Sequence, residues 1–190
     1  ALGEINENIN TINSFLKLSK EEIIKKAIVF HIKGNISEAI KYYIYCINQG
    51  FNNPRVFSNY GLILKDLGKL QEAEFLQREA IKIQPDFASS YSNLGDVCRE
   101  LGKLQEAEIH TRKAIELKPD FANAHSNLGV ILRDLGKLQE AKESIDKAIE
   151  LNPNFADSYS NLGLILRDLG QLKEAEISTR KAIELNPNFA

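Results

Sequence analysis

The chain has 190 residues, of which 43% are hydrophobic and 26% charged, and its formal net charge is −2. This composition is typical of a domain that folds in water, and a charge so near zero gives no electrostatic footprint for nucleic acid. No apolar run is long enough to span a bilayer, and residues 1–10 carry acids and asparagines where a signal peptide needs basic and apolar residues. We therefore expect no nucleic-acid or membrane partner and a reducing, cytoplasmic location.

A period of 34 residues organises the sequence. Residues 122–155 and 156–189 are identical at 24 of 34 positions. The same shift aligns three series of glycine and proline: Gly61, Gly95, Gly129 and Gly163; Gly34, Gly68, Gly102, Gly136 and Gly170; Pro85, Pro119, Pro153 and Pro187. A fixed period of this size indicates a solenoid. The expected units are residues 20–53, 54–87, 88–121, 122–155 and 156–189, preceded by residues 1–19.

The N-terminal segment, residues 1–19, is predicted to cap the first unit. Four apolar residues recur there at helical spacing: Ile5, Ile9, Ile12 and Leu16. They predict an amphipathic helix at Glu4–Leu16, with a frayed linker as the alternative because chain termini are often disordered. Ser19 and Glu22 have the spacing of a capping box and predict the start of the next helix.

Each unit is predicted to form two helices. In the third unit, apolar residues fall at helical spacing on both sides of Gly102, which stands where a left-handed residue ends a helix. Pro119 is expected to end the second helix, since proline cannot continue it. Asp120 and Asn154 stand where the N-caps of the following units are expected.

The spacing of these residues resembles that of a known family. An aromatic residue followed by Leu-Gly, Gly, Ala, Ala and Pro, as in "YSNLG…LG…EA…KAIELKP", is similar to the tetratricopeptide repeat. Gly95 and Ala107 lack side chains that would hold two helices apart, so we expect each pair to cross closely. The last four units match strongly, whereas the first carries Ile23 in place of the aromatic and Phe51 where proline belongs. The resemblance implies an all-α, right-handed superhelical solenoid of five repeats, the first degenerate.

One polar residue recurs inside the first helix of each later unit: Asn59, Asn93, Asn127 and Asn161. Helical geometry of about 100° per residue places it away from the core. The same face carries Leu62, Asp96, Val130 and Leu164. Because the first helices of tetratricopeptide arrays line the concave surface, the resemblance places these residues in a groove. The asparagine pattern is also similar to the repeats of O-linked N-acetylglucosamine transferases, where such a ladder holds substrate polypeptide.

The asparagine ladder has two interpretations. An asparagine amide offers two donors and an acceptor, which match the N–H and C=O of a bound peptide backbone. Helices pack about 8–10 Å apart and an extended chain advances about 3.3 Å per residue, so adjacent asparagines would meet every third residue of that peptide. The alternative is that each asparagine ties one first helix to its neighbour, because buried polar side chains are usually hydrogen-bonded within the protein.

A basic column lies further along the same helices. Its members are Lys65, Arg99, Arg133 and Arg167, each followed directly by an acid. Ion pairs between adjoining units are favoured over ligand contact, since charge runs usually form solvated faces. If the column does form a charged edge of the groove, partners with both signs of charge are expected.

No arrangement of residues indicates catalysis, a cofactor or a metal. The candidates are His31, His110 and His125, which have no recurring partner, and Cys46 and Cys98, which fit best as small buried fillers. No phosphate loop, acid pair or metal-ligand spacing is present. We therefore expect no enzymatic activity, no cofactor and no metal site.

The favoured function is a scaffold that binds a polypeptide segment in its concave groove. One alternative is the non-catalytic, substrate-recognising region of a larger glycosyltransferase or sulfotransferase, and another is a structural module that self-associates. No helix follows Ile177, Ile183 and Leu185 in the last unit, and a solenoid needs a polar cap. A truncated array whose uncapped C-terminal repeat self-associates is therefore expected.

Overall fold

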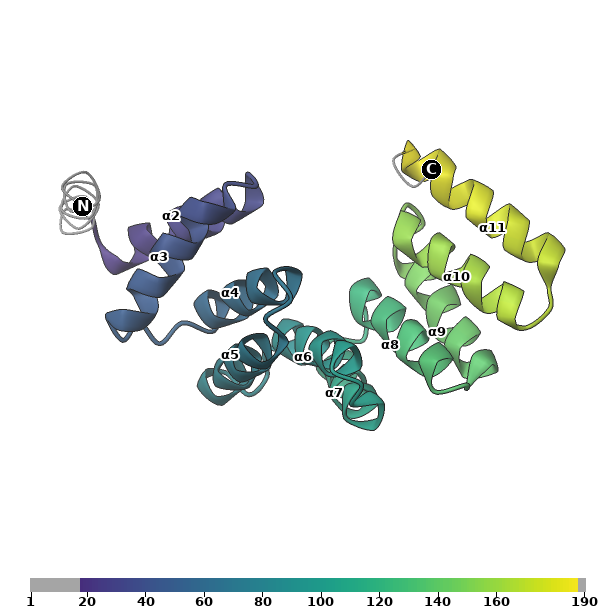
Figure 1. The fold of residues 1–190 in the computed structure, drawn as a ribbon, viewed down its shortest axis with the longest axis horizontal. Helices are drawn as coiled ribbons and strands as arrows, with labels where there is room; N and C mark the ends of the chain where they lie inside the picture. Colours follow the sequence, from purple (N-terminus) through teal and green to yellow (C-terminus); the bar gives the residue numbers. More distant parts are fainter. Residues whose placement is uncertain (1–17, 188–190) are drawn as a thin grey trace.

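The computed structural model describes residues 18–187, which form ten helices and no strand (Figure 1). The helices form five pairs, numbered here as repeats 1 to 5: α2 (Lys20–Ile32) with α3 (Ile36–Asn48), α4 (Pro54–Asp66) with α5 (Leu70–Ile83), α6 (Ala88–Glu100) with α7 (Leu104–Leu117), α8 (Ala122–Asp134) with α9 (Leu138–Leu151), and α10 (Ala156–Asp168) with α11 (Leu172–Leu185). The helix expected at Glu4–Leu16 lies outside the described residues. Among the described helices, none combines the length and apolar character that a membrane span requires.

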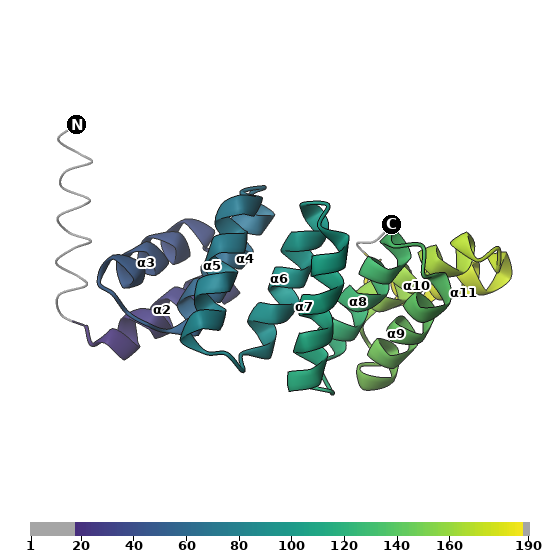
Figure 2. The ribbon, with the colours of Figure 1, turned by 90° about the horizontal axis from the view of Figure 1, so that it is seen from below.

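The pairs follow one another along an arc, with α4, α6, α8 and α10 on its inner side (Figure 1). Each first helix packs on the first helix of the next repeat, as α4 does on α6 and α8 on α10. Each second helix instead contacts the first helix of the next repeat, as α5 contacts α6. The view in Figure 2 shows the resulting row of pairs. The expected all-α superhelical solenoid is confirmed, and its concave face is made by first helices.

The two helices of a pair approach closely at a glycine. A Cβ atom at Gly95 would lie 3.1 Å from the Ala107 carbonyl oxygen, and one at Gly129 would lie 3.1 Å from that of Ala141. Both alanines are fully buried. The close crossing predicted from these small residues is therefore present.

The helix ends agree with the sequence at some positions and differ at others. Gly102 has φ of 76°, and Ser19 and Glu22 form the predicted capping box. Asp120 and Asn154 are not N-caps, because α8 and α10 have Phe121 and Phe155 at that position, without a side-chain cap. The preceding Pro-Asp and Pro-Asn turns are closed by backbone hydrogen bonds, so Asp120 and Asn154 lie one residue before the N-caps.

Repeat 1 stacks on repeat 2 although its sequence is degenerate. Both α2 and α3 contact α4. Tyr43 is fully buried, and its ring stacks on that of Tyr60 with centroids 6.3 Å apart. Ala27 takes the place of the crossing glycine and is also fully buried. A small residue is therefore kept where α2 and α3 cross, and aromatic packing joins this repeat to repeat 2.

Ion pairs bridge the second helices of neighbouring repeats. Lys103 Nζ lies 2.7 Å from Glu74, and Lys137 Nζ lies 2.8 Å from Glu108. The series ends in repeat 4, where Lys142 occupies the position of Glu108 and pairs with a residue of its own helix. Long side chains thus connect the second helices of repeats 2 to 4 on the outer face, where these helices are further apart than the first helices.

These outer ion pairs predict a loss of stability in acid. The hydrogen bond from Lys103 holds the pKa of Glu74 below its ordinary value of 4.5. A carboxyl pKa that is lower in the folded chain contributes stability above the unfolded-state value and loses it as the pH falls. Glu74→Gln should therefore lower the free energy of unfolding by about 1 kcal/mol near neutral pH and by progressively less as the pH falls below 4.5. Urea denaturation of both proteins measures this, and an unchanged difference in acid would contradict it.

Candidate functional site

A hollow lies on the inner face where α6, α8 and α10 run side by side. The residues that line it are Asp96, Arg99, Asn123, Ser126, Asn127, Val130, Phe155, Asp157, Ser160 and Asn161. All of them lie on or directly before the first helices of repeats 3 to 5. The hollow is therefore part of the concave surface that the sequence indicated.

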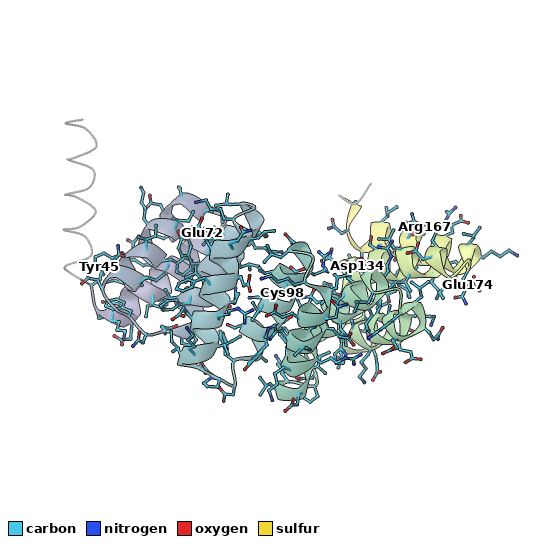
Figure 3. All side chains as sticks on the ribbon, turned by 60° about the horizontal axis from the view of Figure 1, so that its bottom comes forward. Tyr45, Glu72, Cys98, Asp134, Arg167 and Glu174 are labelled. Atoms are coloured by element: carbon cyan, nitrogen blue, oxygen red, sulfur yellow. The ribbon has the colours of Figure 1, made fainter. Side chains whose placement is uncertain are left out.

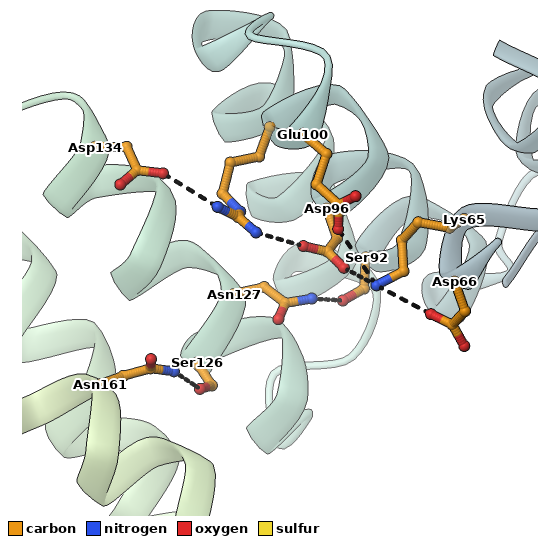
Figure 4. A network of polar contacts seen from close by, with 10 residues as sticks. Lys65, Asp66, Ser92, Asp96, Glu100, Ser126, Asn127, Asp134 and Asn161 are labelled. Atoms are coloured by element: carbon orange, nitrogen blue, oxygen red, sulfur yellow. Dashed lines mark hydrogen bonds and ion pairs between the residues drawn. The ribbon is translucent and has the colours of Figure 1, made fainter. Parts of the chain in front are cut away.

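The asparagines in repeats 3 to 5 are held by serines of the preceding repeat, and Figure 4 shows this for Asn127 and Asn161. Asn127 Nδ2 donates to Ser92 Oγ at 3.2 Å, and Asn93 Nδ2 donates to a serine hydroxyl of repeat 2 at 3.1 Å. The equivalent distance for Asn161 is 3.5 Å. Each hydrogen bond joins two adjacent first helices, as the stacking alternative expected.

That hydrogen bond uses only part of each amide. An asparagine side chain has two N–H donors and a carbonyl oxygen with two lone pairs. Within the described residues, Nδ2 of Asn127 donates to Ser92, and the carbonyl oxygen has no protein partner. Asn127 and Asn161 are half-buried and line the hollow. The serine therefore fixes the orientation of an amide that still has an acceptor and a donor to offer.

Asn59 differs because repeat 1 has no serine at the matching position. Its side chain lies close to the buried hydroxyl of Tyr43, which lies 3.3 Å from Nδ1 of His31. Burial raises the pKa of Tyr43 to about 12, although the Asn59 contact opposes the shift. The phenol therefore stays neutral at physiological pH, and Asn59 lacks the serine hydrogen bond that holds the other three asparagines.

Three of the four members of the basic column contact acids of the next repeat, and Arg167, in the last repeat, contacts its neighbour Asp168. Arg99 Nη1 lies 3.3 Å from Asp134, and Arg133 Nε lies 2.6 Å from Asp168. Lys65 Nζ lies 2.8 Å from Asp96 (Figure 4). Burial disfavours its charged form, but the hydrogen bond and charge of Asp96 outweigh that effect and raise the pKa of Lys65. The pairs of Arg99 and Arg133 are the interrepeat pairs favoured by the sequence. Lys65 lies closer to Asp96 than to Glu100, the acid expected there, which is 3.6 Å away.

The hollow brings together only some of the predicted residues. Asp96, Arg99, Asn127, Val130 and Asn161 line it. The other predicted residues lie outside it. Six of them are half-buried: Asn59, Asn93, Leu62, Leu164, Lys65 and Arg133. The seventh, Arg167, has a side chain that is 58% exposed. The predicted set therefore extends beyond the hollow along the first helices in both directions.

Sequence reasoning missed the residues one turn before two of the asparagines. Asn123 and Asp157 both line the hollow and lie four residues before Asn127 and Asn161. Residues spaced by four share a helix face, so the signal was present in the sequence. These positions add an amide in repeat 4 and a carboxylate in repeat 5 to the site.

A double-mutant cycle should detect the bond between Ser92 and Asn127. Each alanine substitution removes the same interrepeat hydrogen bond, so each should lower the free energy of unfolding by about 0.5–1.5 kcal/mol. The double variant should cost less than the sum by about 0.5–1 kcal/mol. Urea denaturation of the four proteins gives the coupling energy. Strict additivity would show that the bond contributes nothing to stacking.

Several protein-family models match this chain. Models described as tetratricopeptide repeat match residues 54–87, 76–109, 122–155 and 156–189, and one described as TPR repeat matches residues 95–136. The chain is a tetratricopeptide repeat protein. No curated protein sequence matches it.

Solved tetratricopeptide repeat (TPR) structures and related ones have the same architecture. The thermophilic TPR protein TTC0263 of Thermus thermophilus superposes with a TM-score of 0.77 at 19% identity, covering 89% of this chain and 92% of that one. MamA from Desulfovibrio magneticus RS-1 gives 0.70 at 21% identity, covering 89% and 96%. YrrB, a TPR protein with an unusual peptide-binding site, gives 0.62 at 21% identity, covering 87% and 85%. At these identities the likeness establishes the fold of this repeat protein.

Proposed function

We propose that this chain is a protein-interaction scaffold that binds an extended polypeptide along the concave surface of its first helices. The observation that carries the proposal is the hollow over α6, α8 and α10, in which Asn127 and Asn161 present anchored amides. The peptide-binding site reported for YrrB supports a role of this kind for the shared fold.

The amides are suited to reading the main chain of the ligand. A free carbonyl oxygen accepts from a peptide N–H, and the second amide hydrogen donates to a peptide C=O. Because the serine hydrogen bond already orients Asn127, little side-chain entropy remains to be lost on binding. The ligand is therefore an extended segment with at least two backbone contacts about three residues apart.

Charge around the hollow adds a weaker preference. Asp96 and Asp157 supply carboxylates, and Arg99 supplies a guanidinium. Arg99 is committed to Asp134 and Asp96, so its charge is largely satisfied within the protein. We infer that the side chains of the ligand contribute less to affinity than its backbone, with a mild preference for basic residues opposite Asp157.

Peptides selected from a random displayed library against the whole chain test this proposal. Asn127→Ala removes an amide from the hollow and should weaken a selected peptide by about three- to tenfold. Ser92→Ala is the matched control, because it removes the same interrepeat hydrogen bond but leaves the amide in place. It should weaken the peptide by less than about threefold.

Either of two results contradicts the proposal. Selection that yields no peptide able to bind the immobilised chain removes its basis. Equal losses in Asn127→Ala and Ser92→Ala, measured by isothermal titration, would show that the asparagine acts only through stacking.

A further inference from the structure

Two residues of repeat 3 depart from the 34-residue pattern in the same place. Cys98 stands where repeats 2, 4 and 5 have leucine. His110 stands where those repeats have leucine or serine. Glu106, by contrast, is a glutamate in every one of them. Nothing in the sequence connects the cysteine with the histidine, which lie on different helices.

The fold places all three side chains together. Cys98 lies in the last turns of α6, near the middle of the array (Figure 3), while Glu106 and His110 lie one turn apart on α7. The cysteine sulfur, a carboxylate oxygen and a ring nitrogen all lie within 4.8 Å of one another. Nε2 of His110 is 3.5 Å from Oε1 of Glu106.

We propose that Cys98, Glu106 and His110 bind one divalent transition-metal ion, with Zn²⁺ as the preferred ion. Thiolate, imidazole and carboxylate are its usual protein ligands, with bonds of about 2.3, 2.0 and 2.1 Å. In a tetrahedral site these bonds place donor atoms about 3.4–3.6 Å apart. The histidine and glutamate already have that separation, so the cysteine sulfur needs to approach them by about 1.3 Å at most.

The charged neighbours allow Glu106 to change partner. Glu106 is paired with Arg78 of the preceding repeat. Arg78 also bonds Glu74 through Nε at 3.2 Å and Nη2 at 2.8 Å, and Lys103 bonds the other oxygen of Glu74 at 2.7 Å. When a metal ion takes Glu106, both cations keep a partner. The exchange therefore leaves no buried charge without compensation.

The burial of the three ligands fits a site that opens on one side. Cys98 is fully buried, whereas the side chains of Glu106 and His110 are 36% and 18% exposed. An ion would enter past the glutamate, and a water molecule would complete the tetrahedron on the exposed side. The buried thiolate would hold it at the inner end, between α6 and α7.

Titration of the whole, reduced chain with Co²⁺ and then Zn²⁺ tests the site. Co²⁺ bound to a thiolate gives a ligand-to-metal absorption band in the near ultraviolet, which Zn²⁺ should abolish at one equivalent. Two variants, Cys98→Leu and His110→Ser, introduce residues that other repeats carry at the same positions. Each should abolish or weaken metal binding at least about tenfold.

Cys46 provides the control because it is the other buried thiol of the chain. Cys46→Ala introduces the alanine that later repeats carry at this position and should leave the absorption band and the Zn²⁺ affinity unchanged. A band that is absent from the parent chain, or that survives in Cys98→Leu and disappears in Cys46→Ala, overturns the proposal. Circular dichroism of each variant confirms folding, and His110→Ser tests the site independently if Cys98→Leu does not fold.

Discussion

Gly95→Ala should lower the free energy of unfolding by about 1–3 kcal/mol, although alanine is the better helix former. Helix propensity alone predicts a gain of about 0.8–1.0 kcal/mol for this change. A Cβ atom at this position would clash with Oγ1 of Thr111 and lie 3.1 Å from the Ala107 carbonyl oxygen. The contact is in the centre of repeat 3, where both α6 and α7 are tightly packed. Urea denaturation shows whether the substitution lowers or raises the free energy of unfolding.

Thr111 supplies the matched variant for this prediction. Its buried hydroxyl has no hydrogen-bond partner among the described residues, so Thr111→Ala removes both an unsatisfied group and the nearest clash. Gly95→Ala should cost much less in the Thr111→Ala background than in the parent chain, with a difference of about 1 kcal/mol or more. The same cost in both backgrounds would contradict close helix crossing as the reason for glycine.

Replacing Asn59, Asn93, Asn127 and Asn161 together with alanine should reduce peptide affinity by at least about thirtyfold. This follows from four contacts that each contribute about 0.5–1.5 kcal/mol. Three of the asparagines also hold a serine of the preceding repeat, so some loss of stability is expected as well. Binding is therefore measured at a temperature where circular dichroism shows the variant fully folded.

A serine-to-alanine variant separates the two effects. Ser58, Ser92 and Ser126 accept the asparagine hydrogen bonds and are buried behind them. Their replacement should reduce stability at least as much as loss of the asparagines, because Ser58 also bonds the buried Gln77. Peptide affinity should fall far less. A serine variant that loses binding as completely as the asparagine variant would assign the ladder to stacking alone.

The repeat period made most of the fold predictable. Gly102 ends a helix in the left-handed region and Gly95 marks the close crossing, because both roles depend on the absence of a side chain. The interrepeat pairing of Arg99 with Asp134 also followed, because stacking repeats brings equivalent helix ends together. Features that repeat every 34 residues and depend on one helix face were thus accessible from the sequence.

Features that depend on contacts between different positions of the repeat were not predictable. The N-caps at Phe121 and Phe155 follow from how the preceding turns close, which propensity does not describe. Asn127 bonds Ser92, which lies 35 residues earlier in the chain. Because this separation is one more than the period, the two residues fall in different columns when the repeats are aligned, and the alignment does not pair them. For the same reason Cys98 and His110, which appear in separate columns, showed no relation until the helices were packed.

The most direct test of backbone recognition is a scan of a selected peptide with N-methylated residues. Each N-methyl group removes one peptide N–H while the side chain is kept. Affinity measured by isothermal titration should fall by about tenfold at positions spaced by about three residues, and by less than about threefold for alanine substitutions along the peptide. Affinity that tolerates N-methylation throughout but depends on one or two side chains would contradict recognition by the asparagine ladder.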